Sequence, residues 1–346
     1  MWRSCFVQVT MREFLAIDAG GTSSRAVLVD AEGRCRGYGR AAGGNPTSRG
    51  AAPAAAAVAA AIEQAVAAAG GARSVEVVLV AHAGGHPDYL PGIERRLSPL
   101  GVDVPVRPAG DLLALFSSGT HETEGAALIA GTGAIGGAVR HGRLARVVDG
   151  TGWLLGDSGS GFAIGHRVAR AVVDDLDGGP ATRLTPALLE AVGLEDDGDR
   201  ALVEGRPPVM TRLVHALYGL PPVQLSGFAP LAFALADDDP VARGIVQEAV
   251  AALAALLTRV RSHQSDGPLV FGGSVLVEGV LRLDAALLAP LLDAAGDASP
   301  VPVADGLVGA AVLALRAGGV EVDAARFAEL AGGIRTAAAA WSPLSA

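Results

Sequence analysis

The sequence predicts an α/β protein made of two similar halves, and three observations support this. Short β-branched runs alternate with longer alanine- and leucine-rich stretches at helical spacing. A strand that enters a glycine turn occurs at residues 17–22 and again at residues 129–133. A chain of 346 residues, half of them hydrophobic, is long enough for about two domains with buried cores.

The first half is expected to open with an antiparallel meander, because short glycine-containing turns separate its first three strand patterns. Helical and extended patterns then alternate. In chain order, we predict strands at 14–17, 25–30 and 35–40, a helix at 51–69, a strand at 75–81, a helix at 91–97, a strand at 104–107 and a helix at 111–118.

The strand and turn scheme begins again at residue 125, which indicates a second, similar domain. Strands are expected at 125–130 and 135–140, and a third version of the glycine turn at 269–274. Helices at 160–176, 240–262 and 306–316 are expected to cover this half, and 326–340 is a last helix. We therefore predict an N-terminal domain at 1–118, with part of 326–346 packing back on it, and a C-terminal domain at 119–325.

The charged residues exclude several enzyme classes. All 27 basic residues are arginine, and the chain has no lysine. A Walker A phosphate loop, a lysine Schiff base and the strand lysine of protein kinases each need a compact ammonium that arginine does not replace. These classes are excluded.

Composition predicts a cytoplasmic protein with small-molecule partners. The net charge of −9 and the sequence pI near 5.3 predict no binding to nucleic acid or to a membrane surface. The alanine-rich run at 51–69 contains Pro53 and Glu63 and is expected to be a soluble helix. Cys5 and Cys35 form no metal or disulfide pattern, which fits a reducing compartment. The first ten residues lack a signal-peptide pattern, and Met11 is an alternative start.

The turn after the first strand is suited to phosphate. Gly20 and Gly21 let backbone amides approach a ligand, and the hydroxyls of Thr22 and Ser23 can bond phosphate oxygens. Asp18 would repel phosphates unless a divalent cation lay between them, so we predict Mg²⁺ at Asp18, held through water. The alternative is an ordinary β-hairpin with Gly-Gly at its turn.

Two further glycine turns strengthen the phosphate interpretation. Turns from two halves can grip one triphosphate from both sides, and the second is formed by Gly131, Thr132 and Gly133. Gly272 and Gly273 are expected to lie against the adenosine end of the nucleotide. The alternative at this third position is a strand-to-helix turn in which glycine allows close packing.

In order and spacing, these motifs resemble the N-acetylglucosamine kinase and BadF/BcrA-type ATPase branch of the sugar kinase, Hsp70 and actin superfamily. The resemblance spans nearly the whole chain and rests on 18–24, 45–46, 110–111, 128–133, 152–161 and 270–274. It implies two ribonuclease-H-like, actin-like ATPase domains around a nucleotide cleft, with ATP and Mg²⁺ as cofactors. It also suggests a homodimer.

The resemblance implies that Asp111 is the catalytic base, which takes the proton from a sugar hydroxyl as that hydroxyl attacks the terminal phosphoryl group. This chemistry needs such a carboxylate within hydrogen-bond reach of the acceptor. Asn45 and Asp157 match positions that hold sugar hydroxyls, and Gly152 and Trp153 belong to the sugar-side loop. The structural alternatives are an N-cap for Asp111, a turn for Asn45, a helix cap for Asp157 and packing for Trp153.

The expected activity is ATP-dependent phosphoryl transfer to an amino sugar, N-acetylglucosamine or glucosamine. Two departures leave the sugar open. Where the family has the motif D-E-G-S, this chain has Ser158 in place of the glutamate after Asp157. Where the family has G-T-G-S, this chain has Ala134 in place of the serine after Gly133. The alternative is a nucleotide-gated BadF-type ATPase or regulatory protein without a sugar acceptor.

Overall fold

The computed structural model describes residues 12–195, 202–203, 205–263 and 266–342. Met11, the alternative start, lies outside these residues. The chain divides into two compact units. Unit 1 comprises residues 1–122 and 305–346, and unit 2 comprises residues 123–304.

Unit 1 contains a five-stranded sheet in the order β3-β2-β1-β4-β5. The predicted antiparallel meander forms its first three strands, and β4 and β5 then add in parallel to β1. The strands are β1 (Glu13–Ala19), β2 (Ser23–Asp30), β3 (Cys35–Ala42), β4 (Val75–His82) and β5 (Val106–Gly110).

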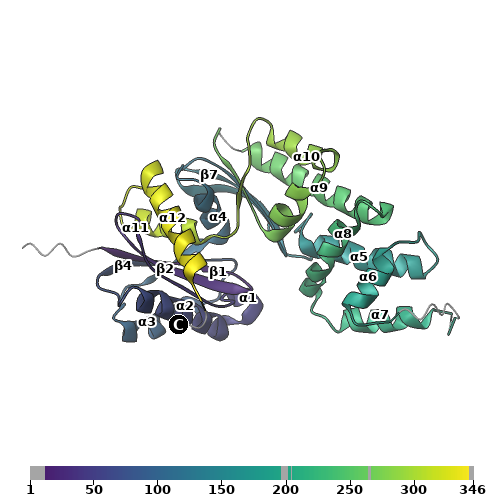
Figure 1. The fold of residues 1–346 in the computed structure, drawn as a ribbon, viewed down its shortest axis with the longest axis horizontal. Coiled ribbons are helices and arrows are strands. Elements are labelled where there is room, and N and C mark those ends of the chain that lie inside the picture. The colour runs from purple at the N-terminus through teal and green to yellow at the C-terminus, as the bar shows by residue number, and fades with distance from the viewer. Residues whose placement is uncertain (1–11, 196–201, 204, 264–265, 343–346) are drawn as a thin grey trace, which may run out of the picture. The chain divides into compact units, whose positions relative to one another are not determined.

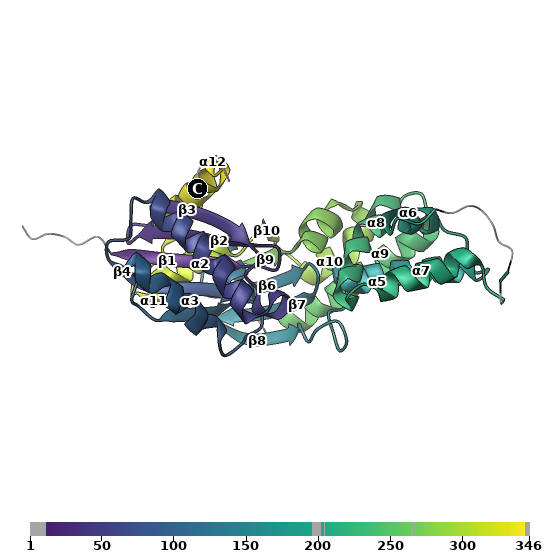
Figure 2. The ribbon, with the colours of Figure 1, turned by 90° about the horizontal axis from the view of Figure 1, so that it is seen from below.

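Helices cover both faces of this sheet (Figures 1 and 2). On one face, α2 lies close to β3, because Gly37 and Gly39 have no side chains: a Cβ at either would lie 2.0 or 2.1 Å from a carbonyl oxygen of α2. On the other face, α11 and α12 cover the strands. The helices of unit 1 are α1 (Pro46–Arg49), α2 (Ala51–Ala68), α3 (Tyr89–Leu97), a short 3₁₀ turn (Ser98–Leu100), α4 (Asp111–Gly119), α11 (Leu307–Ala317) and α12 (Ala324–Ala340).

The placement of α11 differs from the sequence interpretation, which assigned residues 119–325 to the second domain and used 306–316 to cover it. In the structure α11 packs in unit 1, where Leu307 and Val312 share a core with Phe14, Ala16 and Leu79. Its small residues allow this, since a Cβ at Gly309 would lie 1.7 Å from the carbonyl oxygen of Ala114 in α4. The second unit therefore ends at residue 304, and both ends of the described chain belong to unit 1.

Unit 2 repeats the same topology, with strand order β10-β9-β6-β7-β8. An antiparallel meander again comes first, and two parallel strands follow. Two of its strands, β8 and β10, were not predicted from the sequence. The strands are β6 (Gly125–Ala130), β7 (Ala134–Arg140), β8 (Arg143–Asp149), β9 (Leu269–Gly272) and β10 (Val301–Val303).

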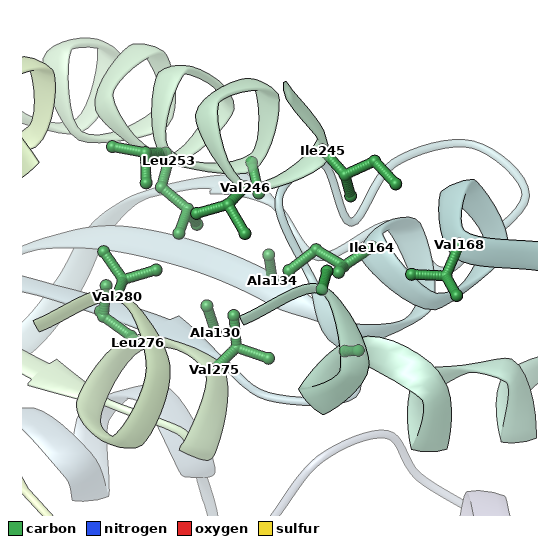
Figure 3. Packing of buried hydrophobic residues seen from close by; sticks show 14 of the residues in the cluster. Ala130, Ala134, Ile164, Val168, Ile245, Val246, Leu253, Val275, Leu276 and Val280 are labelled. Carbon is green, nitrogen blue, oxygen red and sulfur yellow. The ribbon is translucent and has the colours of Figure 1, made fainter. Parts of the chain in front are cut away.

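The core of unit 2 joins its sheet to its helices (Figure 3). Ala130 and Ala134, on either side of the glycine turn, lie among Ile164 of α5, Val246 of α9 and Val275 after β9. The helices are α5 (Gly161–Leu176), α6 (Leu184–Ala191), α7 (Pro208–Tyr218), α8 (Ala229–Leu235), α9 (Pro240–Arg261) and α10 (Ala285–Ala295), with helical turns at Pro222–Phe228, Val275–Gly279 and Val280–Arg282.

Two helices, α2 and α9, are long and apolar enough to cross a membrane by length and composition. In their apolar stretches, 44% of the residues of α2 and 50% of those of α9 are buried inside the protein. Each packs on the sheet of its own unit, α2 on β2 and β3 and α9 on β7 and β8. Both therefore serve as core helices of a folded α/β unit.

Candidate active site

The first glycine turn is a tight hairpin at the end of β1. The Gly20 amide donates to the Ser23 carbonyl at 3.1 Å, and Gly21 and Thr22 are exposed at the tip. Ser23 is buried as the first residue of β2. The exposed amides and the Thr22 hydroxyl are thus available to a ligand, whereas the Ser23 hydroxyl is less accessible than the sequence suggested.

The segment that carries Asn45 is bonded to this turn. The amides of Gly44 and Asn45 both donate to the Gly20 carbonyl, at 3.0 and 3.2 Å. The Asn45 side chain accepts from the Thr47 amide at 2.8 Å and so caps α1. In this structure Asn45 is thus a helix cap rather than a turn residue, and unit 1 brings it beside the predicted phosphate turn.

Asp18 lies in a network that sequence reasoning missed. Arg25 reaches Asp18 at 3.4 Å and Asp305 at 3.6 Å, and the Gly306 amide donates to Asp18 at 3.3 Å. Asp305 and Asp18 are 287 positions apart in the sequence. No local pattern could have joined them, although Asp305-Gly306 at the start of α11 is a recognisable turn signal.

Burial and the charge of Asp305 raise the pKa of Asp18 to about 7, against the opposing effects of Arg25 and the Gly306 amide. The charge of Asp111 acts in the same direction as that of Asp305. Asp18 thus interacts with two other carboxylates and one guanidinium, a local excess of negative charge that fits a divalent cation. Among the described residues, no three His, Cys, Asp or Glu side chains are placed so that together they could hold a metal ion directly.

Asp111 is the first residue of α4, directly after β5. The N-cap position belongs to Gly110, so the capping alternative for Asp111 does not hold. One carboxylate oxygen accepts from the Leu112 amide at 2.8 Å. Burial raises the pKa of Asp111, and the Leu112 amide and His82 oppose this effect. A half-buried carboxylate of raised basicity is suited to accept a proton from a hydroxyl.

In unit 2, the second glycine turn is attached to the start of α5. The Gly131 amide donates to the Gly133 carbonyl at 2.9 Å, while the Gly161 and Phe162 amides donate to the carbonyls of Gly131 and Thr132. Thr132 is exposed at the tip. The turn is therefore a fixed feature whose exposed tip, like that of the first turn, offers a threonine hydroxyl.

Asp157 lies against this second turn. Its carboxylate accepts from the Ala134 amide at 3.2 Å, and a Cβ added at Gly133 would lie 2.9 Å from it. Burial raises the pKa of Asp157, and the charge of Asp149 adds to the effect. The cap of α5 is Ser160, whose hydroxyl accepts from the Ala163 amide, so the capping alternative for Asp157 is wrong.

Asp149, which sequence reasoning missed, organises the loop that carries Asp157. It accepts from the amides of Gly150 and Asp157 at 2.8 and 2.7 Å. Both aspartates have positive φ, 63° for Asp149 and 59° for Asp157, a conformation that aspartate tolerates better than most residues. The hydrogen bonds of Asp149 to this loop, together with the bond from the Ala134 amide to Asp157, hold the Asp157 carboxylate beside the second turn.

The third glycine turn differs from the other two because its chain continues as a helical turn. Gly273, with φ 87°, packs on the second turn, and a Cβ there would lie 2.3 Å from the Ala130 carbonyl oxygen. The strand-to-helix alternative thus describes its geometry. The fold of unit 2 nevertheless places this glycine pair, Gly272 and Gly273, beside Gly131 of the second turn.

The loop that contains Gly152 and Trp153 is exposed. Trp153 is 44% exposed, and its ring centroid lies 5.4 Å from that of Phe162. Both rings line a cavity of about 1120 Å³ along α5, α7 and α9. Of the predicted site residues, only Trp153 is among those that line this cavity.

Each unit therefore gathers one group of predicted residues at a glycine turn. Unit 1 holds Asp18, the first turn, Asn45 and Asp111, and unit 2 holds the second and third turns and Asp157. Residues 15–182 match the sequence model of the BadF/BadG/BcrA/BcrD ATPase family.

The match to the BadF/BadG/BcrA/BcrD ATPase family confirms the resemblance inferred from the motifs. It includes every predicted site residue from Asp18 to Asp157 and ends before Gly272 and Gly273. A curated relative, the N-acetyl-D-glucosamine kinase of Dictyostelium discoideum, is 34% identical over 192 residues. These residues are 53% of this chain and 57% of the relative, so the match spans little more than half of that protein.

Solved structures confirm the fold. A candidate N-acetylglucosamine kinase from Chromobacterium violaceum aligns with a TM-score of 0.64 and 24% identity, over 88% of this chain and 99% of that one. Another from Porphyromonas gingivalis aligns with a TM-score of 0.62 and 22% identity, over 89% and 100%. The chain has the two-unit α/β fold of these proteins.

Proposed function

We propose that this protein is an ATP-dependent kinase that transfers a phosphoryl group to a hydroxyl of an amino sugar, N-acetylglucosamine or glucosamine. The observation that carries this proposal is Asp111, a half-buried carboxylate at the start of α4 that lies in the same unit as a glycine turn suited to phosphate. The family match and the curated relative support the same activity.

The proposal gives roles to the first two glycine turns and to four polar side chains, Asp18, Asn45, Asp111 and Asp157. Asp111 orients the acceptor hydroxyl and accepts its proton, and Asn45 and Asp157 bind further hydroxyls of the sugar. The exposed amides and threonine hydroxyls of the first two turns bind phosphate oxygens. Asp18 would hold Mg²⁺ through water, and when bound the cation neutralises charge on the phosphates.

The proposal is tested by ADP release with ATP and Mg²⁺ against glucosamine, N-acetylglucosamine, glucose, N-acetylmannosamine and no sugar. A rate raised strongly by one amino sugar supports the proposal and names the acceptor. A rate that no sugar changes favours the alternative, a nucleotide-gated ATPase or regulatory protein. We also propose that the protein is cytoplasmic and forms a homodimer. Gel filtration tests the homodimer.

Asp111→Asn removes the base but keeps the size of the side chain. We expect phosphoryl transfer to fall by about 10²- to 10⁴-fold, because general-base catalysis contributes on that order. Nucleotide affinity, measured by calorimetry, should stay unchanged. Glu63→Gln, at an exposed position on α2, is the matched carboxylate-to-amide control and should keep full activity. Full transfer by Asp111→Asn would remove Asp111 from the mechanism.

A further inference from the structure

The first glycine turn has a cation beside it that the mechanism above does not use. Arg49, the last residue of α1, is exposed, and its Nε atom donates to the Gly21 carbonyl at 3.4 Å. Gly21 is itself exposed at the tip of the turn. The guanidinium therefore lies next to the amides that are proposed to bind phosphate.

The backbone around Arg49 holds it at this place. A Cβ at Gly43 would lie 2.0 Å from the Gly21 carbonyl oxygen and 3.0 Å from the Arg49 Nε atom. The Arg49 amide donates to the Asn45 carbonyl at 3.2 Å, and the Asn45 amide donates to the Gly20 carbonyl. A close approach that needs glycine and this series of hydrogen bonds join the turn, Asn45 and Arg49 into one arrangement.

The charge of Arg49 is not neutralised by the protein. Arg25, which follows the turn in β2, reaches the carboxylates of both Asp18 and Asp305. Arg49 forms no ion pair with any residue that the structure describes, and its bond to Gly21 uses only the Nε atom. Its two other guanidinium nitrogens and its positive charge are thus left for a ligand.

This group is suited to bind phosphate. A guanidinium is planar and always charged, and its nitrogens can donate to two oxygens of one phosphate group. Because the chain has no lysine, a permanently charged side chain that binds phosphate here must be an arginine. The same segment carries Asn45, a proposed ligand of the sugar, and the phosphate that meets the sugar is the terminal one of ATP.

We propose that Arg49 is a substrate-binding residue whose guanidinium donates hydrogen bonds to the terminal phosphoryl group of ATP at the first glycine turn. This inference rests on the proposed use of ATP and adds a residue to the phosphate site. The bond from Nε to the Gly21 carbonyl orients the guanidinium, and its two remaining nitrogens bind the phosphoryl oxygens.

Arg49 would also act on the rate of transfer. The acceptor oxygen bonds to the terminal phosphorus, the bond from that phosphorus to the ADP oxygen breaks, and the hydroxyl proton passes to Asp111. A guanidinium next to the phosphoryl oxygens stabilises their negative charge in the transition state. Loss of Arg49 should therefore lower both the affinity for ATP and the rate.

The test compares Arg49→Met, which keeps an unbranched side chain without charge, with Arg49→Lys, which keeps the charge. Calorimetry with Mg²⁺ measures binding of ADP and of AMP-PNP, an ATP analogue that does not transfer its terminal phosphoryl group. We expect Arg49→Met to bind AMP-PNP about 10-fold or more weakly, because bonds to charged groups contribute on that order. ADP affinity should change less than about 2-fold, and Arg49→Lys should recover part of the AMP-PNP affinity.

The control is Arg95→Met, at an exposed position of α3 in the same unit, which should match the wild type in both affinities. The Tm of Arg49→Met should stay close to that of the wild type, because the side chain is exposed. A role confined to holding the turn predicts a lower Tm and equal weakening of AMP-PNP and ADP binding. That result would overturn the inference.

The inference and the proposed function can fail separately. If Arg49→Met binds AMP-PNP as tightly as the wild type does and transfers phosphate at the same rate, the inference is wrong while the proposed kinase activity stands. If the wild type binds AMP-PNP but phosphorylates no sugar, the proposed function fails, and the two affinities still decide the inference. If the wild type binds neither nucleotide, both fail.

Discussion

Asp18 illustrates how a single residue in this protein depends on contacts distant in the sequence. Its carboxylate is 14% exposed and accepts from Arg25, from the next strand, and from the amide of Gly306 at the start of α11. Burial and Asp305 raise its pKa to about 7, from an ordinary value of 3.8. Asp18 is therefore largely protonated in the folded protein at pH values where it ionises in the unfolded chain.

Because the pKa of Asp18 is raised in the folded protein, we expect the folded protein to lose stability as the pH rises. The contribution of Asp18 is fully present below its unfolded pKa and is lost as the pH rises through about 7. Without Mg²⁺, the free energy of unfolding should fall between about pH 4 and 7 by at most about 1.4 kcal/mol per pH unit. Asp18→Asn should lack this slope.

Urea unfolding of both proteins in EDTA across this range measures the difference. Parallel pH profiles would contradict the assigned pKa. Mg²⁺ added at pH 7 should stabilise the wild type and have less effect on Asp18→Asn, because the cation would bind the ionised carboxylate.

At the residue scale, sequence reasoning identified candidates better than it identified their partners. Asp18, Asn45 and Asp111 stand next to turns or strand ends, where a local pattern exposes them. Arg25 gave no such signal, and the turn signal at Asp305 did not reveal its partners, because these residues meet only when α11 returns to the first sheet. The strand predicted at 75–81 stopped one residue short of His82, which the structure makes the last residue of β4.

At the scale of the elements, the two glycine segments of unit 2 lie against each other. Gly273 has φ 87° and almost no space for a side chain, and Gly152 has φ 85° with nothing within 4 Å of an added Cβ. Alanine at either position would be strained by the positive φ, but only alanine at Gly273 would also be crowded by neighbouring atoms. Comparing the two substitutions therefore separates these two effects on stability.

Gly273→Ala should destabilise the protein more than Gly152→Ala. Each substitution should lower the free energy of unfolding by about 1 kcal/mol or more, because alanine disfavours positive φ. Gly273→Ala also places a methyl group against the Ala130 carbonyl oxygen, which adds a steric cost. Differential scanning calorimetry should show a Tm several degrees lower for Gly273→Ala. Equal Tm values for the two variants would mean that the close packing of the turns contributes nothing.

Elements with strong local patterns were predictable, and the weakly patterned ones were not. The sequence periodicity predicted all strands of the two meanders except β8. It also predicted the helices α2, α5, α9 and α12. Of the two strands missed, β8 is rich in arginine and mostly exposed, and β10 has only three residues. The third turn was misjudged because a glycine pair after a strand precedes a strand or a helix equally well.

At the scale of the whole molecule, the two units differ in how the chain builds them. Unit 2 is one continuous segment, 123–304, with its own sheet and core. Unit 1 needs two segments, since α11 and α12 cover the sheet face that contains Phe14, Ala16 and Leu79. The sequence predicted the repeated topology, but not that α11 belongs to the first unit, because an apolar helix shows no preference for one sheet over another.

Residues 123–304 expressed alone should fold and melt cooperatively, as followed by circular dichroism. Residues 1–122 alone should not, because one face of their sheet would be exposed to water. Co-expression of 1–122 with 305–346 should restore a cooperative transition. A cooperative transition of 1–122 without that segment would show that α11 and α12 are dispensable for the first unit.

The return of α11 to the first sheet also sets an order of events during translation. At about 5–20 residues per second, about 10–40 s pass between synthesis of the last residue of 1–122 and synthesis of the end of α11. During that time the nascent chain presents an uncovered apolar sheet face, while 123–304 emerges from the ribosome as a segment that can fold. The part of the protein that is made first is thus the part that is finished last, and holding its exposed strands apart from other chains is a task for the cell's chaperones.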